Sequence, residues 1–148
     1  MTSIRVKILK EGAKLPTYGS AEAAGADLYA CLEEELTILP GKTAFVPTGI
    51  ALEVPKGCAG LIYARSGLAC KRGLAPANKV GVVDSDYRGE ILVALHNHGT
   101  EPQTVGTPAS GVTPPRTSSS RTVRNSYPFA CSSSTIRSAA STEVSSVS

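Results

Sequence analysis

The feature that most constrains this chain is a change in composition near residue 105. Residues 106–148 contain 13 Ser and 6 Thr among 43 positions, and they contain no Lys or Asp. Their apolar residues follow neither the two-residue period of a strand nor the 3.6-residue period of a helix. Because such a segment buries too little apolar surface to offset its chain entropy, we expect it to be disordered. The folded domain is therefore expected within residues 1–105.

The first 105 residues have the pattern of an all-β protein. Apolar and polar residues mostly alternate over 4–8, as in a strand with one buried face. A longer apolar run follows, in which Pro47 and Gly49 predict a bend. Strands are expected in the regions 4–8, 25–30, 35–39, 44–54, 58–63, 80–83 and 90–95. A short helix is expected over Ser66–Lys71. Short strands at this spacing predict a sandwich, jelly roll or barrel.

Charge and cysteine usage exclude some classes of function. The formal charge is +3, and residues 106–148 account for it with four Arg and one Glu, so the first 105 residues are neutral. A neutral domain gives no electrostatic case for a nucleic-acid partner. The four cysteines form no C-x-x-C pair, which favours reduced thiols in a cytoplasmic protein. No stretch approaches the ~20 apolar residues of a membrane span, so no membrane partner is expected.

The segment Ala64–Ala69 (ARSGLA) has the residue types of an anion-binding loop. Arg65 offers a planar cation that suits phosphate oxygens, and Ser66 offers a hydroxyl donor. Gly67 allows the backbone to approach an anion closely. The alternative is structural: Ser66 caps a short helix and Arg65 is solvated surface.

A second segment, 81–89 (GVVDSDYRG), places two carboxylates beside an apolar strand. Asp84 and Asp86 could serve a water-activating base and a magnesium-dependent site, and Tyr87 offers a flat face for a base or sugar. The alternative is a polar hairpin tip, with Asp84 in an Asx-turn. A third candidate, Asp27, is a lone acid at the start of an apolar strand, where a strand-edge charge is the alternative.

Two other patterns are set aside. Leu36 stands where a P-loop ending in Gly41-Lys42-Thr43 would need its first Gly. His96 and His98 have no third metal ligand at a suitable spacing.

Taken together and in this order, the three segments resemble motifs of the trimeric, all-β dUTPase family. Residues 23–30 (AAGADLYA) resemble its first motif, 64–69 its second, and 78–91 (NKVGVVDSDYRGEI) its third. Ala64 stands where the second motif usually has Pro. The resemblance covers about residues 3–105 and implies a distorted jelly roll that assembles as a homotrimer. It also implies hydrolysis of dUTP to dUMP and pyrophosphate with Mg²⁺, which limits uracil incorporation into DNA and supplies dUMP for dTMP synthesis.

The resemblance also implies roles for individual residues. Asp84 matches the acid that activates the attacking water, and Tyr87 matches the aromatic that packs on deoxyribose and excludes a 2′-hydroxyl. Asn78 matches the residue that reads the uracil edge. Asp27 matches the acid near the phosphate–magnesium end. Phosphate binding falls to three residues of the second motif, Arg65, Ser66 and Gly67. The Mg²⁺ is held mainly by the triphosphate and water, so no protein ligand is assigned.

The chain departs from the family after Val105. The fourth motif, similar to G-D-R-I-A-Q, is due there, but 106–112 reads GTPASGV. The fifth, a Gly-rich segment with Arg and Phe, is absent. We interpret 106–148 as an out-of-frame or aberrantly joined segment, so the dUTPase-like domain over 1–105 is incomplete and weak turnover is expected. Two alternatives stay open, a non-catalytic nucleotide-binding fragment of this fold and the related dCTP deaminase.

Overall fold

The computed structural model of the chain describes residues 4–106 and two later strands, at 126–133 and 144–146. The described strands are β1 (Ile4–Ile8), β2 (Thr17–Tyr18), β3 (Ala26–Tyr29), β4 (Leu36–Ile38), β5 (Thr43–Pro47), β6 (Ile50–Glu53), β7 (Cys58–Ile62), β8 (Leu74–Pro76), β9 (Gly81–Val83), β10 (Leu92–Asn97), β11 (Gln103–Val105), β12 (Ser126–Ser133) and β13 (Val144–Ser146). One helix, α1 (Ser66–Arg72), accompanies them.

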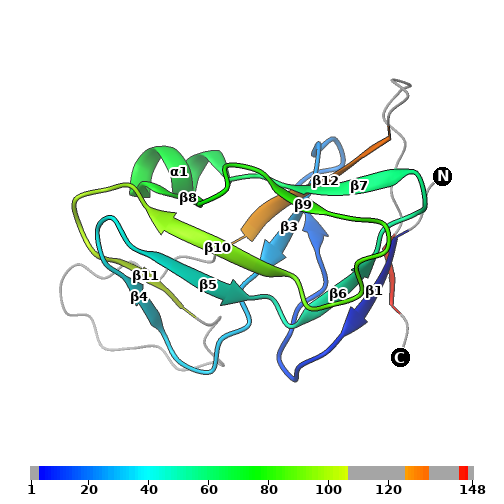
Figure 1. The fold of residues 1–148 in the computed structure, drawn as a ribbon, viewed down its shortest axis with the longest axis horizontal. Helices are drawn as coiled ribbons and strands as arrows, with labels where there is room; N and C mark the ends of the chain where they lie inside the picture. The colour runs from blue at the N-terminus through cyan, green and yellow to red at the C-terminus, as the bar shows by residue number, and fades with distance from the viewer. Residues whose placement is uncertain (1–3, 107–125, 134–143, 147–148) are drawn as a thin grey trace.

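The strands form four small sheets around one core (Figure 1). Their orders are β13-β1-β6, β5-β10-β8, β11-β4 and β2-β3-β12-β7-β9. The core consists of aliphatic side chains, and the largest that are almost fully buried are Leu28, Ile38, Ile50, Leu52, Leu74 and Leu95. The predicted all-β class is confirmed, and so is the short helix.

The long apolar run at 44–54 divides into two strands, as Pro47 and Gly49 predicted. β5 ends at Pro47 and β6 begins at Ile50. Gly49 adopts a left-handed φ of 69°, and a Cβ atom there would lie 2.7 Å from the Cβ atom of Ala13 and 2.9 Å from the Sγ atom of Cys31. A residue without a side chain is therefore required at this bend.

The alternative of a hairpin tip at 84–89 is wrong, because β9 and β10 do not pair. β9 pairs with β7, whereas β10 pairs with β5 and β8. After the loop, the backbone of Ile91 bonds to the β5–β6 connection: its N–H donates to the Ile50 carbonyl (2.9 Å), and its carbonyl accepts from the Thr48 N–H (3.2 Å). These long-range hydrogen bonds direct the chain into a different sheet and leave a gap between β9 and β10.

Two parts of the segment expected to be disordered are strands in the structure. β12 lies between β3 and β7, and β13 pairs with β1. Without β12, the facing edges of β3 and β7 would present unpaired N–H and C=O groups, so a strand there satisfies both. For these two segments the structure differs from the expected disorder. The expectation for 107–125, 134–143 and 147–148 lies outside the described residues.

Candidate active site

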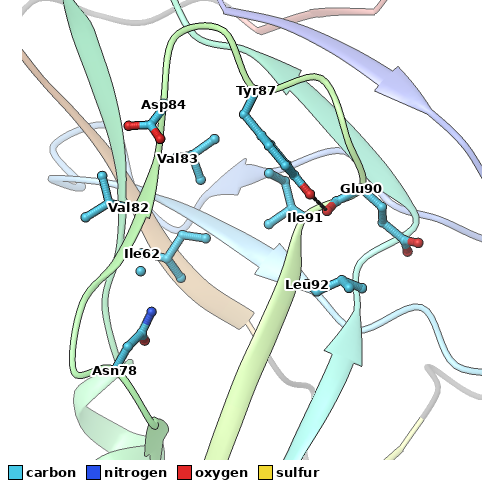
Figure 2. A pocket seen from close by; sticks show the side chains of 10 residues that line it. Ile62, Asn78, Val82, Val83, Asp84, Tyr87, Glu90, Ile91 and Leu92 are labelled. Atoms are coloured by element: carbon cyan, nitrogen blue, oxygen red, sulfur yellow. Dashed lines mark hydrogen bonds between the residues drawn. The ribbon is translucent and has the colours of Figure 1, made fainter.

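A pocket of about 210 Å³ lies where β9 and β10 diverge (Figure 2). It is lined by three residues singled out in the sequence, Asn78, Asp84 and Tyr87, and by Ile62, Gly81, Val82, Val83, Glu90, Ile91 and Leu92. Ligand pockets commonly measure ~300–1,000 Å³. This one therefore suits a base and its sugar better than a whole nucleoside triphosphate.

Asn78 reaches the pocket from a tight turn before β9. Lys79 has a left-handed φ of 63°, and the Val80 N–H donates to the Asn78 carbonyl at 2.7 Å. A Cβ atom on Gly81 would lie 3.3 Å from Ile62 and 3.7 Å from the side-chain nitrogen of Asn78. The tighter of these contacts is with Ile62, so glycine here keeps the strand close to Ile62. The Asn78 amide can both donate and accept hydrogen bonds.

Tyr87 is fixed by the loop that carries it. Its N–H donates to the Asp84 carbonyl at 3.1 Å, and its hydroxyl donates to the Glu90 carbonyl at 2.9 Å (Figure 2). A Cβ atom on Gly89 would lie 2.5 Å from the Tyr87 hydroxyl, so the ring needs glycine at this position. Tyr87 is 44 % exposed, which leaves part of its ring open to a ligand.

Arg88 bonds back to the same loop. Its Nη1 donates to the Ser85 carbonyl at 2.8 Å and to the Tyr87 carbonyl at 2.9 Å. Asp84 remains exposed, so its carboxylate can accept a proton from a bound water. Among the described residues, the Asp84 side chain forms no hydrogen bond of the kind that an Asx-turn requires.

The predicted phosphate-binding residues lie at the start of α1. Arg65 occupies the N-cap position, and no side chain caps the helix. The alternative in which Ser66 is the N-cap is therefore wrong, and Ser66 and Gly67 begin the first turn. Arg65 instead forms an ion pair with Asp27 of β3, with 3.1 Å between Nη1 and Oδ2. The second and first motifs therefore meet in this chain.

The candidate residues form two groups in a single copy of the chain. One group, Asn78, Asp84 and Tyr87, lines the pocket, and the other surrounds the Asp27–Arg65 ion pair. In Figure 1, α1 lies toward the left of the molecule, and the loop that joins β9 to β10 lies toward the right. A site that uses both groups would need parts of two copies.

Glu90 is the pocket residue that sequence reasoning did not single out. It lies within residues 78–91, which resemble the third motif, at the start of the strand expected at 90–95, where an acid is unusual. Its carboxylate accepts a hydrogen bond from the Gly49 N–H at 2.9 Å and pairs with Lys10 at 3.4 Å. The unusual position was the only available signal, because both partners are distant in the sequence.

The described residues contain no group of three or more His, Cys, Asp or Glu side chains that could hold a metal ion. The His96 ring contacts the His98 ring at 4.4 Å between centroids with a tilt of 58°, and His96 bonds through Nδ1 to the Thr43 hydroxyl at 2.9 Å. Cys31, Cys58 and Cys70 are free thiols. Within the described part of the chain, no helix is long and apolar enough to cross a membrane.

Comparison with known proteins gives one consistent family. A family model described as dUTPase matches residues 11–108. A deoxyuridine 5′-triphosphate nucleotidohydrolase of Desulfitobacterium hafniense is 56 % identical over 107 residues, which cover 69 % of this chain and 71 % of the relative. A protein of the same name from Syntrophotalea carbinolica is 48 % identical over 99 residues, covering 67 % of each chain.

Solved structures give the same fold. A dUTPase from Streptococcus mutans superposes with a TM-score of 0.68 at 22 % identity, covering 93 % of this chain and 99 % of that one. A point mutant of the dUTPase from Staphylococcus aureus phage phi11, described as coordinating a structural Mg(II) ion, gives a TM-score of 0.60 at 28 % identity. That match covers 66 % of this chain and 61 % of the other.

Proposed function

The chain belongs to the dUTPase family, and from this premise we propose that its β9–β10 pocket binds the deoxyuridine part of dUTP. The family reaction is that of a hydrolase acting on dUTP, and the comparisons do not favour the deaminase or non-catalytic alternatives. One observation carries the proposal: Asn78, Asp84 and Tyr87, assigned to uracil, water and deoxyribose, line one pocket of suitable size.

Asp84 is the proposed general base. Its exposed carboxylate takes a proton from a water, whose oxygen forms a bond to the α-phosphorus. The bond from that phosphorus to the bridging oxygen breaks, and pyrophosphate leaves with the electron pair. The rigid loop keeps Asp84 and Tyr87 in fixed relative positions, so the reacting groups are aligned before the reaction begins.

The proposed phosphate-binding residues are Arg65, Ser66 and Gly67, with Asp27 beside them. Because they lie outside the pocket, they would act on the triphosphate bound to a neighbouring copy. The guanidinium of Arg65 matches the geometry of phosphate oxygens. Asp27 orients that guanidinium through the 3.1 Å ion pair.

A homotrimer would bring the two groups together, and an exposed apolar face supports such an assembly. Phe45 is 70 % exposed and Leu92 is 51 % exposed. Phe45 lies opposite Ala94 and Leu92 opposite Pro47, so all four residues share the outer face of the β5–β10 pair. Apolar patches of this kind mark contact surfaces between proteins.

Magnesium enters this proposal as part of the substrate, the Mg²⁺–dUTP complex. The proposal assigns no protein ligand to the ion, which phosphate and water would hold. A cytoplasmic location also remains a proposal, in keeping with an enzyme of nucleotide metabolism.

The direct test compares substrates under one set of conditions. The purified chain is incubated with dUTP, UTP or dCTP in the presence of Mg²⁺, and pyrophosphate and ammonia are measured. Pyrophosphate release from dUTP in preference to UTP is expected. Ammonia release from dCTP would instead favour the deaminase. Binding of dUTP without release of pyrophosphate would indicate a non-catalytic nucleotide-binding protein.

A further inference from the structure

We infer that Glu90 is a positioning residue that holds Tyr87 in place and so sets the preference for deoxyribose over ribose. This inference rests on the proposed function of the pocket. Glu90 contacts three segments of the chain, and each contact involves a different atom of the residue.

The backbone carbonyl of Glu90 is the acceptor for the Tyr87 hydroxyl, at 2.9 Å. The orientation of the ring therefore depends on where this carbonyl lies. Figure 2 shows the ring extending from the loop toward Glu90 and Ile91, on the side of the pocket away from Val82 and Asp84. A displacement of Glu90 would therefore move the Tyr87 ring. The Asp84 carboxylate, which lies on the opposite side of the pocket, would stay in place.

The side chain of Glu90 fixes the residue to the rest of the domain. Its Oε1 accepts a hydrogen bond from the Gly49 N–H at 2.9 Å. Gly49 is itself anchored, because its carbonyl accepts a hydrogen bond from the Leu9 N–H at 2.8 Å. Glu90 is thus attached to a residue that is held by a distant part of the chain.

The second oxygen of Glu90 pairs with Lys10 at 3.4 Å. The Lys10 side chain is 50 % exposed and that of Glu90 is 21 % exposed. Ion pairs with one solvated partner contribute little, so the hydrogen bond to Gly49 is the stronger of the two side-chain restraints on Glu90. An amide in place of the carboxylate could still accept that hydrogen bond.

These contacts connect Glu90 to sugar selection. Tyr87 is the residue expected to pack against the 2′ carbon of the sugar, where it leaves no room for a hydroxyl. A ring that is no longer fixed can move aside and admit ribose. Loss of the Glu90 side chain should therefore reduce discrimination between deoxyribose and ribose more than it reduces affinity for the base.

The experiment measures binding of dUMP and UMP to the full chain by titration calorimetry. Glu90→Ala should lower the dUMP-to-UMP affinity ratio about tenfold, as expected for one lost hydrogen bond. Glu90→Gln should keep most of the ratio, because its amide oxygen can accept from the Gly49 N–H. Lys10→Met, which removes the ion pair alone, should leave the ratio near that of the unaltered chain. An unchanged ratio in Glu90→Ala would overturn the inference.

A second measurement separates this inference from the proposed function. Amide hydrogen exchange follows the N–H groups of Tyr87 and Gly49 without any nucleotide. Glu90→Ala should accelerate both, and Glu90→Gln should not. If the unaltered chain binds neither nucleotide, the proposed function fails, and the exchange result then decides the positioning role alone. Equal exchange in Glu90→Ala and the unaltered chain overturns that role.

Discussion

Asp27 and Arg65 form an ion pair across a strand that separates the elements carrying them. Asp27 lies on β3, Arg65 follows β7, and β12 lies between these two strands in the sheet. Asp27 is 14 % exposed at its side chain, whereas Arg65 is 49 % exposed. The largely buried acid therefore holds a guanidinium that is about half exposed to solvent.

This geometry predicts that Arg65→Lys weakens binding of the triphosphate more than it weakens the fold. Lysine keeps the charge but loses the planar fork that matches phosphate oxygens. Affinity for the non-hydrolysable analogue dUpNHpp should fall about tenfold, which is ~1.4 kcal/mol. Calorimetric titration measures it. Asp27→Asn is the matched variant, because it changes the other partner of the ion pair. Its free energy of unfolding should change by less than about 1 kcal/mol. Unchanged affinity in Arg65→Lys would contradict the assignment.

Asp84 and Asp86 provide an internally controlled test of the general base. Both are exposed carboxylates of the same loop, but only Asp84 lines the pocket. Asp84→Asn should lower kcat by ~10²–10⁴, the usual contribution of a general base, with KM nearly unchanged. Asp86→Asn should retain most of kcat. Pyrophosphate release at saturating dUTP gives both values, and equal losses in the two variants would argue against a specific role for Asp84.

Mixing two inactive variants tests whether the site is shared between copies. Arg65→Ala and Asp84→Asn each remove one group of the proposed site. After unfolding and joint refolding in equal amounts, a trimer with shared sites should restore about a quarter of the sites. Turnover relative to the unaltered chain measures this recovery. Phe45→Asp in both variants should abolish recovery, because it places a charge on the proposed contact face. Activity that does not recover would contradict a site shared between copies.

The strand pattern of the first 105 residues could be predicted because it depends on local alternation and turn residues. β1 coincides with the predicted strand, and the bend at Pro47 and Gly49 lies where these residues indicated. The separation of β9 and β10 into different sheets could not be predicted in the same way. The Asp84–Gly89 loop has the local composition of a hairpin, and the hydrogen bonds that separate its strands come from Thr48 and Ile50, far earlier in the chain.

The candidate site likewise contains residues that the local sequence indicates and one whose role depends on distant contacts. Asp84 and Tyr87 are close in the sequence, and the pocket contains both. The resemblance supplied a role for Asn78 that its own surroundings in the sequence did not suggest. Glu90 escaped notice because its importance depends on Gly49, whose N–H meets it only after folding. Long-range contacts of this kind have no local signature.

Alanine substitutions at Gly41 and Gly49 distinguish the cost of backbone strain from the cost of steric crowding. Both have a φ of 69°, but a Cβ atom on Gly41 would meet nothing within 4 Å, whereas one on Gly49 would meet Ala13 and Cys31 below 3 Å. Gly41→Ala should cost about 1–2 kcal/mol for the left-handed conformation alone. Gly49→Ala should cost about 1–3 kcal/mol more, because packed atoms must move. Urea denaturation measures both, and equal losses would show that crowding at Gly49 is relieved without cost.

The encoding DNA tests the interpretation of residues 106–148. When the reading frame moves back by one base, a serine codon TCN contributes its T and C to a new codon. This new codon, NTC, begins with the last base of the preceding codon and encodes Phe, Leu, Ile or Val. A run such as Ser118–Ser120 can therefore arise when codons for apolar residues are read in the wrong frame. By the same shift, Thr142–Ser145 can encode Gly-Gly-Phe, which fits the Gly-rich segment that is missing.

We therefore expect TCN codons at Ser118–Ser120 and third bases at 142–144 that spell Gly-Gly-Phe in the shifted frame. DNA sequencing reads these bases directly. Expression of the reframed gene should give a protein that hydrolyses dUTP faster than this chain, because the fourth and fifth motifs would then be present. Serine codons of the AGC or AGT type in the run would contradict the frame shift. In that case residues 106–148 would be a native segment, and β12 would be the strand that the chain itself supplies between β3 and β7.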